Sequence, residues 1–284
     1  MANTISARSK RDVYRSKTLA QALRKMLVAE KVCLVDNSDL ATIQSPYGSQ
    51  PTTTVQALTG TYSAADFTLT DDALTVDNEF IVAEHIFDFQ KVLNNFDLFS
   101  SRFDEMTYSV ATAVDRFVVN NLCEDGTGTY TTASGGFTNA ANINTIMGDL
   151  LGKVAGYSEV FNGLFLIIES TDVPGFIKAG ATNGFSFADS ALNNGFMDSY
   201  MGVDLYVVRS VFADETLGTK TYTNSGHRVF GVKNMATYAA PRDIQQDEKS
   251  VSGKTGKELV VWGYVGFKLW APKTDLIIDI TLTA

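Results

Sequence analysis

The chain has 284 residues, 45% of them hydrophobic, and a formal net charge of −9. Single hydrophobic cores stop growing near this length, so we expect one domain with two lobes, or two small domains. The sequence has no run of about 18 consecutive apolar residues, which argues against a transmembrane helix. Its polar, basic N-terminus lacks the apolar segment of a secretion signal, so a soluble protein is expected.

The charge is unevenly distributed along the sequence. Residues 1–31 contain eight basic and two acidic residues, a net charge of +6, whereas residues 32–90 contain no Lys or Arg and are acidic. Opposite charges in adjacent segments suggest that the segments meet, within one subunit or between neighbours. A solvated tail or a nucleic-acid contact is the alternative for the basic segment. Apart from Tyr14 it lacks interleaved aromatics, so no platform for stacking single-stranded bases is visible.

The first predicted elements are a helix over residues 18–30 and a short strand over 32–35. From residue 51 to 86 the apolar residues recur with period two, which predicts β-strands. The pattern is carried by Val55, Ala57, Phe67, Leu69, Leu74 and Val76. With a turn at Asp71 and Asp72, the segment is predicted to form a long two-stranded hairpin. Such a ribbon is marginally stable alone, so it needs another surface to lie on.

Residues 86–123 contain no Pro or Gly and are predicted to form one very long helix of roughly 50 Å. Apolar side chains three and four residues apart share one face of it. They are Phe89, Val92, Leu93, Phe96, Phe99, Phe103, Met106, Val110, Val114 and Phe117. A coiled coil is the alternative, but the stripe is aromatic-rich and lacks alternating flanking charges. A rod lying across a sheet fits better.

The remainder alternates helices and strands, which indicates an α+β lobe. Residues 124–141 are predicted to be a flexible Gly/Thr/Ser linker, and residues 242–256 a polar loop. Helices are predicted over 143–155 and 173–180, and strands over 163–170, 201–210, 227–234, 258–272 and 275–282.

Few residues have the pattern of a chemical site. Cys33 and Cys123 lie in unrelated contexts without a C-x-x-C motif, so we predict two buried thiols, with neither a disulfide nor a zinc site. His85 and His227 fall in or at the edge of predicted strands, where a structural role is the simpler interpretation. We therefore expect no catalytic residues, no cofactor and no metal.

The acidic pairs Asp71/Asp72 and Asp77/Glu79 are the remaining candidates for chemistry. Paired carboxylates bind Ca²⁺ or act as acid and base in glycoside hydrolysis. A solvated turn explains them more simply, so a carbohydrate-active enzyme is retained only as an alternative function.

The order of these elements resembles the major capsid protein of tailed double-stranded DNA bacteriophages, the HK97-like fold. The matching residues are the hairpin exit and long helix (74–119, with Asp115 in a family-typical position), NGF at 194–196 followed by GVDLYVVRS at 202–210, and GYVGFKLWAP at 263–272. The resemblance spans nearly the whole chain, and its weight comes from order and spacing.

The resemblance implies an α+β fold of five segments. These are an N-arm over 1–48, an extended loop (the β-hairpin) over 49–84, a peripheral domain with a spine helix over 85–141, most of an axial domain over 142–224, and returning strands of both domains over 225–284. The extended loop has no Lys. A Lys–Asn cross-link of the kind that some family members make therefore cannot start there.

The implied function is that of a structural protein, not an enzyme, which self-assembles through homo-hexamers and homo-pentamers into an icosahedral virion capsid in the host cytoplasm. The implied partners are a separate scaffolding protein, a portal and packaged double-stranded DNA bound without sequence specificity, and no membrane. The expected assembly interface comprises Arg8, Lys10, Arg11, Arg15, Phe67, Leu69, Asp71, Asp72, Leu74 and Val76. An encapsulin-like nanocompartment shell would share the fold, and a phage tail-tube protein is a further alternative.

Overall fold

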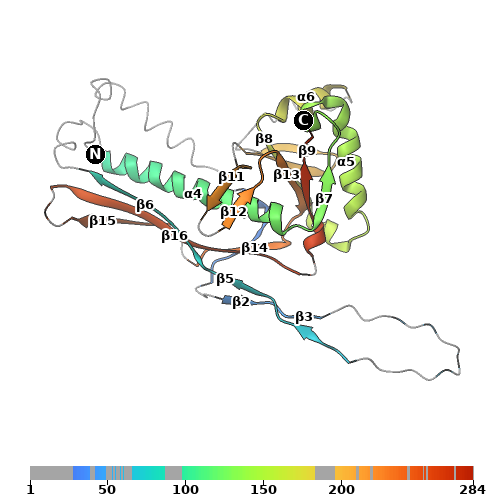
Figure 1. Cartoon of the computed structure of the whole chain (residues 1–284), viewed down its shortest axis with the longest axis horizontal. Coiled ribbons are helices and arrows are strands. Elements are labelled where there is room, and N and C mark those ends of the chain that lie inside the picture. Colours follow the sequence, from blue (N-terminus) through green and yellow to red (C-terminus); the bar gives the residue numbers. More distant parts are fainter. Residues whose placement is uncertain are drawn as a thin grey trace.

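The computed structural model describes residues 28–38, 42–48, 53, 55, 58, 60, 66–86, 98–182, 196–208, 211–217, 220–241, 244–251, 253, 255–271 and 273–283. Figure 1 shows an elongated molecule in which a long helix runs along a narrow sheet toward a rounder lobe, while a thin ribbon projects away from both. None of the helices in these residues is both long and apolar enough to span a bilayer.

The narrow sheet is organised around β16 (Lys257–Leu269). Three strands pair antiparallel with β16: β15 (Gln245–Ser250), β6 (Asn78–Ile86) and β14 (Ala236–Ala239). β14 pairs with the C-terminal end of β16. The short β1 (Leu34–Asp36) adds in parallel to β14. We name this sheet, with the helix that lies on it, the peripheral lobe.

The long helix α4 (Leu98–Asp125) confirms the predicted spine from residue 98 onward. Met106, Val110, Val114 and Phe117 of its apolar stripe are buried, as a helix packed on a sheet requires. The predicted start at Ile86 is wrong, because Ile86 ends strand β6, where it pairs with Lys257. The first part of the stripe, from Phe89 to Phe96, lies outside the described residues.

The rounder, axial lobe contains a six-stranded sheet in the order β7-β17-β13-β8-β10-β9. Its strands are β7 (Gly128–Thr131), β17 (Ile277–Thr281), β13 (His227–Val232), β8 (Leu164–Glu169), β10 (Val203–Val208) and β9 (Phe196–Tyr200). β8 pairs in parallel with β10, and the first five of its residues are buried, as expected for a strand covered on both faces.

Two helices and three short 3-10 turns complete this lobe: α5 (Ala140–Val154), α6 (Val173–Thr182), η1 (Gly136–Thr138), η2 (Ser158–Asn162) and η3 (Thr274–Leu276). The rings of Phe137 and Phe176 stack at 5.4 Å, and Tyr200 meets Phe176 edge-on. The Tyr200 hydroxyl donates to Asn144 Oδ1 at 2.5 Å, which ties β9 to α5. Aromatic packing thus fixes the helices against the edge of the sheet.

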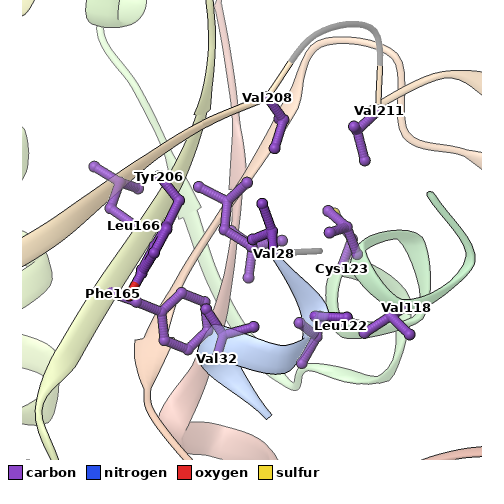
Figure 2. Close-up of a cluster of buried hydrophobic side chains, with 14 of the residues drawn as sticks. Val28, Val32, Val118, Leu122, Cys123, Phe165, Leu166, Tyr206, Val208 and Val211 are labelled. Carbon is purple, nitrogen blue, oxygen red and sulfur yellow. The ribbon is translucent and has the colours of Figure 1, made fainter. Parts of the chain in front are cut away.

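The short helix α2 (Ala29–Val32) joins the two lobes. The side chains of Val32 and of Val28, the residue that precedes the helix, lie between Val118 and Leu122 of α4 and the Phe165 ring of β8 (Figure 2). Residues 28–32 therefore lie between the spine helix and the axial sheet and contact both.

Two predicted loops contain regular structure. The polar loop over 242–256 includes β15, an almost fully exposed edge strand with the sequence QQDEKS, and the linker over 124–141 includes β7 and η1. A hairpin of β11 (Asp214–Leu217) and β12 (Lys220–Thr223) was also not predicted. An exposed edge strand is held mainly by backbone hydrogen bonds. It therefore needs no alternation of apolar and polar residues, and the sequence pattern does not reveal it.

Candidate assembly surfaces

The projecting ribbon is built from four short strands. The outgoing chain forms β2 (Thr42–Gln44) and β3 (Tyr47–Gly48), and the returning chain forms β4 (Leu69–Thr70) and β5 (Ala73–Thr75). β2 pairs with β5 and β3 with β4, both antiparallel. Figure 1 shows the ribbon leaving the body beside β14 and pointing away from it.

The predicted hairpin exists, but its predicted turn is wrong. Asp71 and Asp72 lie between β4 and β5 on the returning side of the ribbon, and Ser45 opposite donates its N–H to the Asp72 carbonyl. The outgoing strands begin at Thr42, which lies within the predicted N-arm over 1–48. Period two identifies which residues alternate between faces, but it does not identify the partner strand.

The base of the ribbon is fastened to the peripheral sheet. Leu74 has no exposed surface, and a Cβ placed on Gly266 of β16 would lie 3.0 Å from its side chain and 2.8 Å from the Thr75 carbonyl oxygen. The glycine lets the returning strand cross close over β16. Leu74, a predicted interface residue, therefore has no surface to offer a second copy, and Val76 is half-buried beside it.

Asp72 also belongs to this base. Its carboxylate forms an ion pair with Lys268 at 2.8 Å and accepts hydrogen bonds from the backbone N–H groups of Ala271 and Ala73. Burial by itself raises the pKa of Asp72, but these donors outweigh it and hold the pKa below its usual value. A general acid would need a raised pKa, so Asp72 does not fit the general-acid role of a glycosidase-type pair. The prediction of a solvated turn is wrong for this residue.

The outer part of the ribbon has the exposed apolar side chains. Phe67 is 74% exposed and Leu69 is 58% exposed, although Phe67 also lies over Gly48 of the opposite strand. Asp66 and Asp71 beside them are exposed. The described part of the ribbon therefore presents apolar and acidic groups together, with no cation of its own.

A second candidate surface, which the sequence did not reveal, is a groove of about 540 Å³ on the peripheral lobe. Its apolar lining comes from β1, the middle of α4, β14 and β16, and includes Val35, Ala111, Val114, Tyr238, Tyr264 and Val265. Glu30, Lys31 and Asn37 also line it. Of these lining residues, Val35 and Tyr264 expose part of their side chains. These residues come from four separate segments, so no sequence pattern joins them.

The spine helix is held on its sheet by charge as well as by packing. Arg102 of α4 donates Nε to Glu84 of β6 at 2.9 Å, and it also pairs with Glu105 one turn further along the helix. The hydrogen bond to Glu84 is the main reason that the pKa of Arg102 is raised. Glu84 belongs to the acidic segment, so one part of that segment is neutralised within the chain itself.

The four basic residues of the predicted interface, Arg8, Lys10, Arg11 and Arg15, lie outside the described residues. Asp77 and Glu79 are exposed at the end of the ribbon and the start of β6, and Asp77 accepts a hydrogen bond from Asn78. His227 pairs with Asp279 in the axial lobe, and both cysteines are buried free thiols, as predicted.

Comparison with known proteins supplies structural relatives but no sequence relatives. No protein-family model and no curated protein sequence matches the chain. The solved capsid of Cyanophage P-SCSP1u matches with a TM-score of 0.68 at 12% identity, over 92% of this chain and 89% of that one. A structure from Mycobacterium phage Che8 matches with a TM-score of 0.65 at 14% identity over 84% of each chain.

A virus-like particle from Pyrococcus furiosus also matches, with a TM-score of 0.60 at 8% identity, over 94% of this chain and 98% of that one. In each case the similarity covers most of both chains, so it concerns both lobes and their connection. At these identities the likeness establishes the fold.

Proposed function

We propose that this chain, which has the α+β HK97-like fold of phage capsid structures, is the subunit of an icosahedral capsid that encloses phage double-stranded DNA. The observation that carries the proposal is the likeness to solved capsids over 84% to 92% of the chain. Rings of five or six subunits require two different surfaces that are complementary to each other, because the same head-to-tail contact is repeated until the ring closes. The projecting ribbon and the groove are the proposed pair of surfaces.

In the proposed assembly, the ribbon of one subunit lies over the spine helix of its neighbour. Phe67 and Leu69 supply the apolar surface, and the groove beside α4 receives it. Each side chain contributes roughly 1.5 to 3 kcal/mol if it becomes fully buried. Both are more than half exposed in the single chain, so most of this stabilisation is available only on assembly.

In this contact, complementary charges set how the ribbon is oriented on the neighbouring subunit. Lys31, which lines the groove, is the last residue of the segment whose net charge is +6, and Asp66 and Asp71 of the ribbon are exposed. We infer that Arg8, Lys10, Arg11 and Arg15 of the neighbour meet the acidic ribbon. Exposed ion pairs contribute only about 0.2 to 1 kcal/mol each, so they select the register while apolar burial provides the strength.

Hexamers and pentamers of the chain, a separate scaffolding protein, a portal and assembly in the host cytoplasm complete the proposal. The negative net charge of the chain suits an inner surface along which packaged DNA slides, since like charge opposes tight binding. The proposed division keeps the boundaries at 48, 84, 141 and 224, which separate the N-arm, the extended loop, the peripheral domain, the axial domain and the returning strands of both domains.

Negative-stain electron microscopy of the purified chain, alone and with a candidate scaffold, tests this function. Closed shells or rings of five and six subunits are expected. A monodisperse monomer under every condition would contradict the proposal, and open rods would indicate a tail tube. Shells that copurify with an enzyme cargo, and without genome or portal, would identify a nanocompartment instead.

A further inference from the structure

Three potential metal ligands converge where the spine helix meets the axial sheet. Cys123 lies near the end of α4, His227 begins β13 and Asp279 lies in β17, and one ligand atom from each lies within 4.8 Å of the others. Cys123 Sγ is 2.9 Å from Asp279 Oδ1, and His227 Nδ1 is 2.9 Å from the same oxygen.

The fold explains why these residues meet. β13 and β17 are antiparallel, with His227 opposite Thr281 and Val229 opposite Asp279. His227 and Asp279 are therefore diagonal neighbours on one face of the sheet, the arrangement in which side chains of adjacent strands reach each other. Cys123 is brought to that face by the last turns of α4, at the edge of the buried cluster in Figure 2.

We propose that Cys123, His227 and Asp279 form a binding site for Zn²⁺ or a similar borderline-soft divalent cation. Thiolate, imidazole and carboxylate are the ligands that zinc takes in proteins, at about 2.3, 2.0 and 2.0 to 2.2 Å respectively. Tetrahedral ligands at those distances are about 3.3 to 3.7 Å apart. Cys123 Sγ and His227 Nδ1 would therefore each move away from Asp279 Oδ1 by about 0.4 to 0.8 Å on binding, and water can occupy the fourth position.

Binding exchanges one proton for the metal. Burial, followed by the hydrogen bond to Asp279, raises the pKa of the Cys123 thiol, so the metal-free chain holds it protonated. On binding, the S–H bond breaks, its proton leaves to solvent and a sulfur–metal bond forms. The imidazole proton resides on Nε2 while Nδ1 ligates the metal. No group is oxidised or reduced.

The surroundings permit a cation to enter and remain. The His227 and Asp279 side chains are 23% and 18% exposed, so the site reaches solvent although Cys123 is buried. The neighbouring Arg228 is paired with Asp172 at 2.5 Å and with Glu169 at 3.2 Å, so its charge is already compensated. A bound metal would clamp the end of the spine helix to two inner strands of the axial sheet.

Cobalt titration of the unassembled full-length chain tests the site. Co²⁺ should produce a sulfur-to-cobalt charge-transfer band in the near ultraviolet that saturates at one equivalent per chain. The band should be lost in Cys123→Ser and kept in Cys33→Ser, which removes the other buried thiol. A wild-type chain without this band at excess cobalt, or a band lost only in Cys33→Ser, would overturn the proposal.

X-ray absorption of the zinc-loaded wild-type chain requires no variant and decides the matter if Cys123→Ser does not fold. One sulfur at about 2.3 Å together with nitrogen or oxygen ligands is expected. Zinc should also raise the thermal unfolding midpoint of the wild type and of Cys33→Ser, but not of Asp279→Asn. A first shell of nitrogen and oxygen alone would refute the site, and neither result bears on whether the chain forms shells.

Discussion

Asp115, in the middle of the spine helix, accepts a hydrogen bond from the backbone N–H of Val28 at 3.1 Å, across 87 positions of sequence. Its second carboxylate oxygen accepts from the N–H of Ala29 at 3.0 Å. The carboxylate therefore satisfies two donors at the start of α2 that would otherwise be buried without partners. This contact fixes the start of α2 against the spine helix.

The stability of the chain should depend on the protonation of Asp115. Burial is the main cause that raises its pKa from 3.8 to about 7; the nearby Glu30 adds to this effect, and the two backbone donors oppose it. The folded state then binds a proton more tightly than the unfolded state, so the contribution to the free energy of unfolding falls as pH rises from about 4 to 7.

Asp115→Asn should flatten this part of the stability profile by an amount on the order of a few kcal/mol. Chemical denaturation of both proteins at closely spaced pH values measures it. An identical slope in the two proteins would show that Asp115 does not titrate in this range. Asp115→Ala should cost roughly 2 to 4 kcal/mol near pH 4, where the folded chain holds the Asp115 carboxyl protonated, because both N–H groups lose their acceptor. The cost should shrink as pH rises toward 7.

The buried ion pair of Arg228 and Asp172 should be costly to break from one side. Their side chains are 4% and 1% exposed, and Arg228 also donates to the His227 carbonyl. Arg228→Met should destabilise the chain by about 3 to 5 kcal/mol, because Asp172 remains buried without its cation. The exposed pair Lys249 and Asp247 is the matched control, and Lys249→Met should change stability by less than about 0.5 kcal/mol. Equal losses in urea unfolding would contradict the assignment.

Two glycines of β16 should respond differently to alanine. A Cβ at Gly266 would lie 2.8 Å from the Thr75 carbonyl oxygen, whereas at Gly263 the nearest atom is a side-chain carbon of Ile244 at 3.7 Å. Gly266→Ala should therefore displace the returning strand and cost about 1 to 3 kcal/mol, and Gly263→Ala should be nearly neutral. Thermal unfolding compares the two variants, and protease sensitivity of the ribbon should rise in Gly266→Ala alone.

The outer and inner apolar residues of the ribbon should have separable effects. Phe67→Ser with Leu69→Ser should abolish shells while leaving monomer stability within about 0.5 kcal/mol, because both side chains are mostly exposed. Leu74→Ala should instead destabilise the monomer by about 2 to 5 kcal/mol. Electron microscopy and calorimetry of the same preparations separate these effects. Normal shells from the double variant would remove the ribbon tip from assembly.

Local patterns in the sequence were sufficient for the elements that bury an apolar face. The stripe from Met106 to Phe117 predicted the spine helix, because an element that buries one face has apolar residues at regular spacing. The continuous apolar run at 164–168 predicted the central strand β8. The α+β class and the order of the elements follow from the same signal.

Tertiary structure decided what joins distant segments. Period two marked the ribbon, but only backbone pairing placed Thr42 opposite Thr75 and moved Asp72 from a supposed turn to an ion pair with Lys268. The QQDEKS edge strand is held by main-chain bonds that any sequence offers. Cys123 and His227 are 156 and 52 positions from Asp279, so the spacing of these residues in the sequence gives no sign that they form a cluster. The periodicity of a sequence shows which side chains are buried. It does not show which strands pair, or which charged groups and thiols meet, because these contacts form only when segments far apart in the sequence pack together.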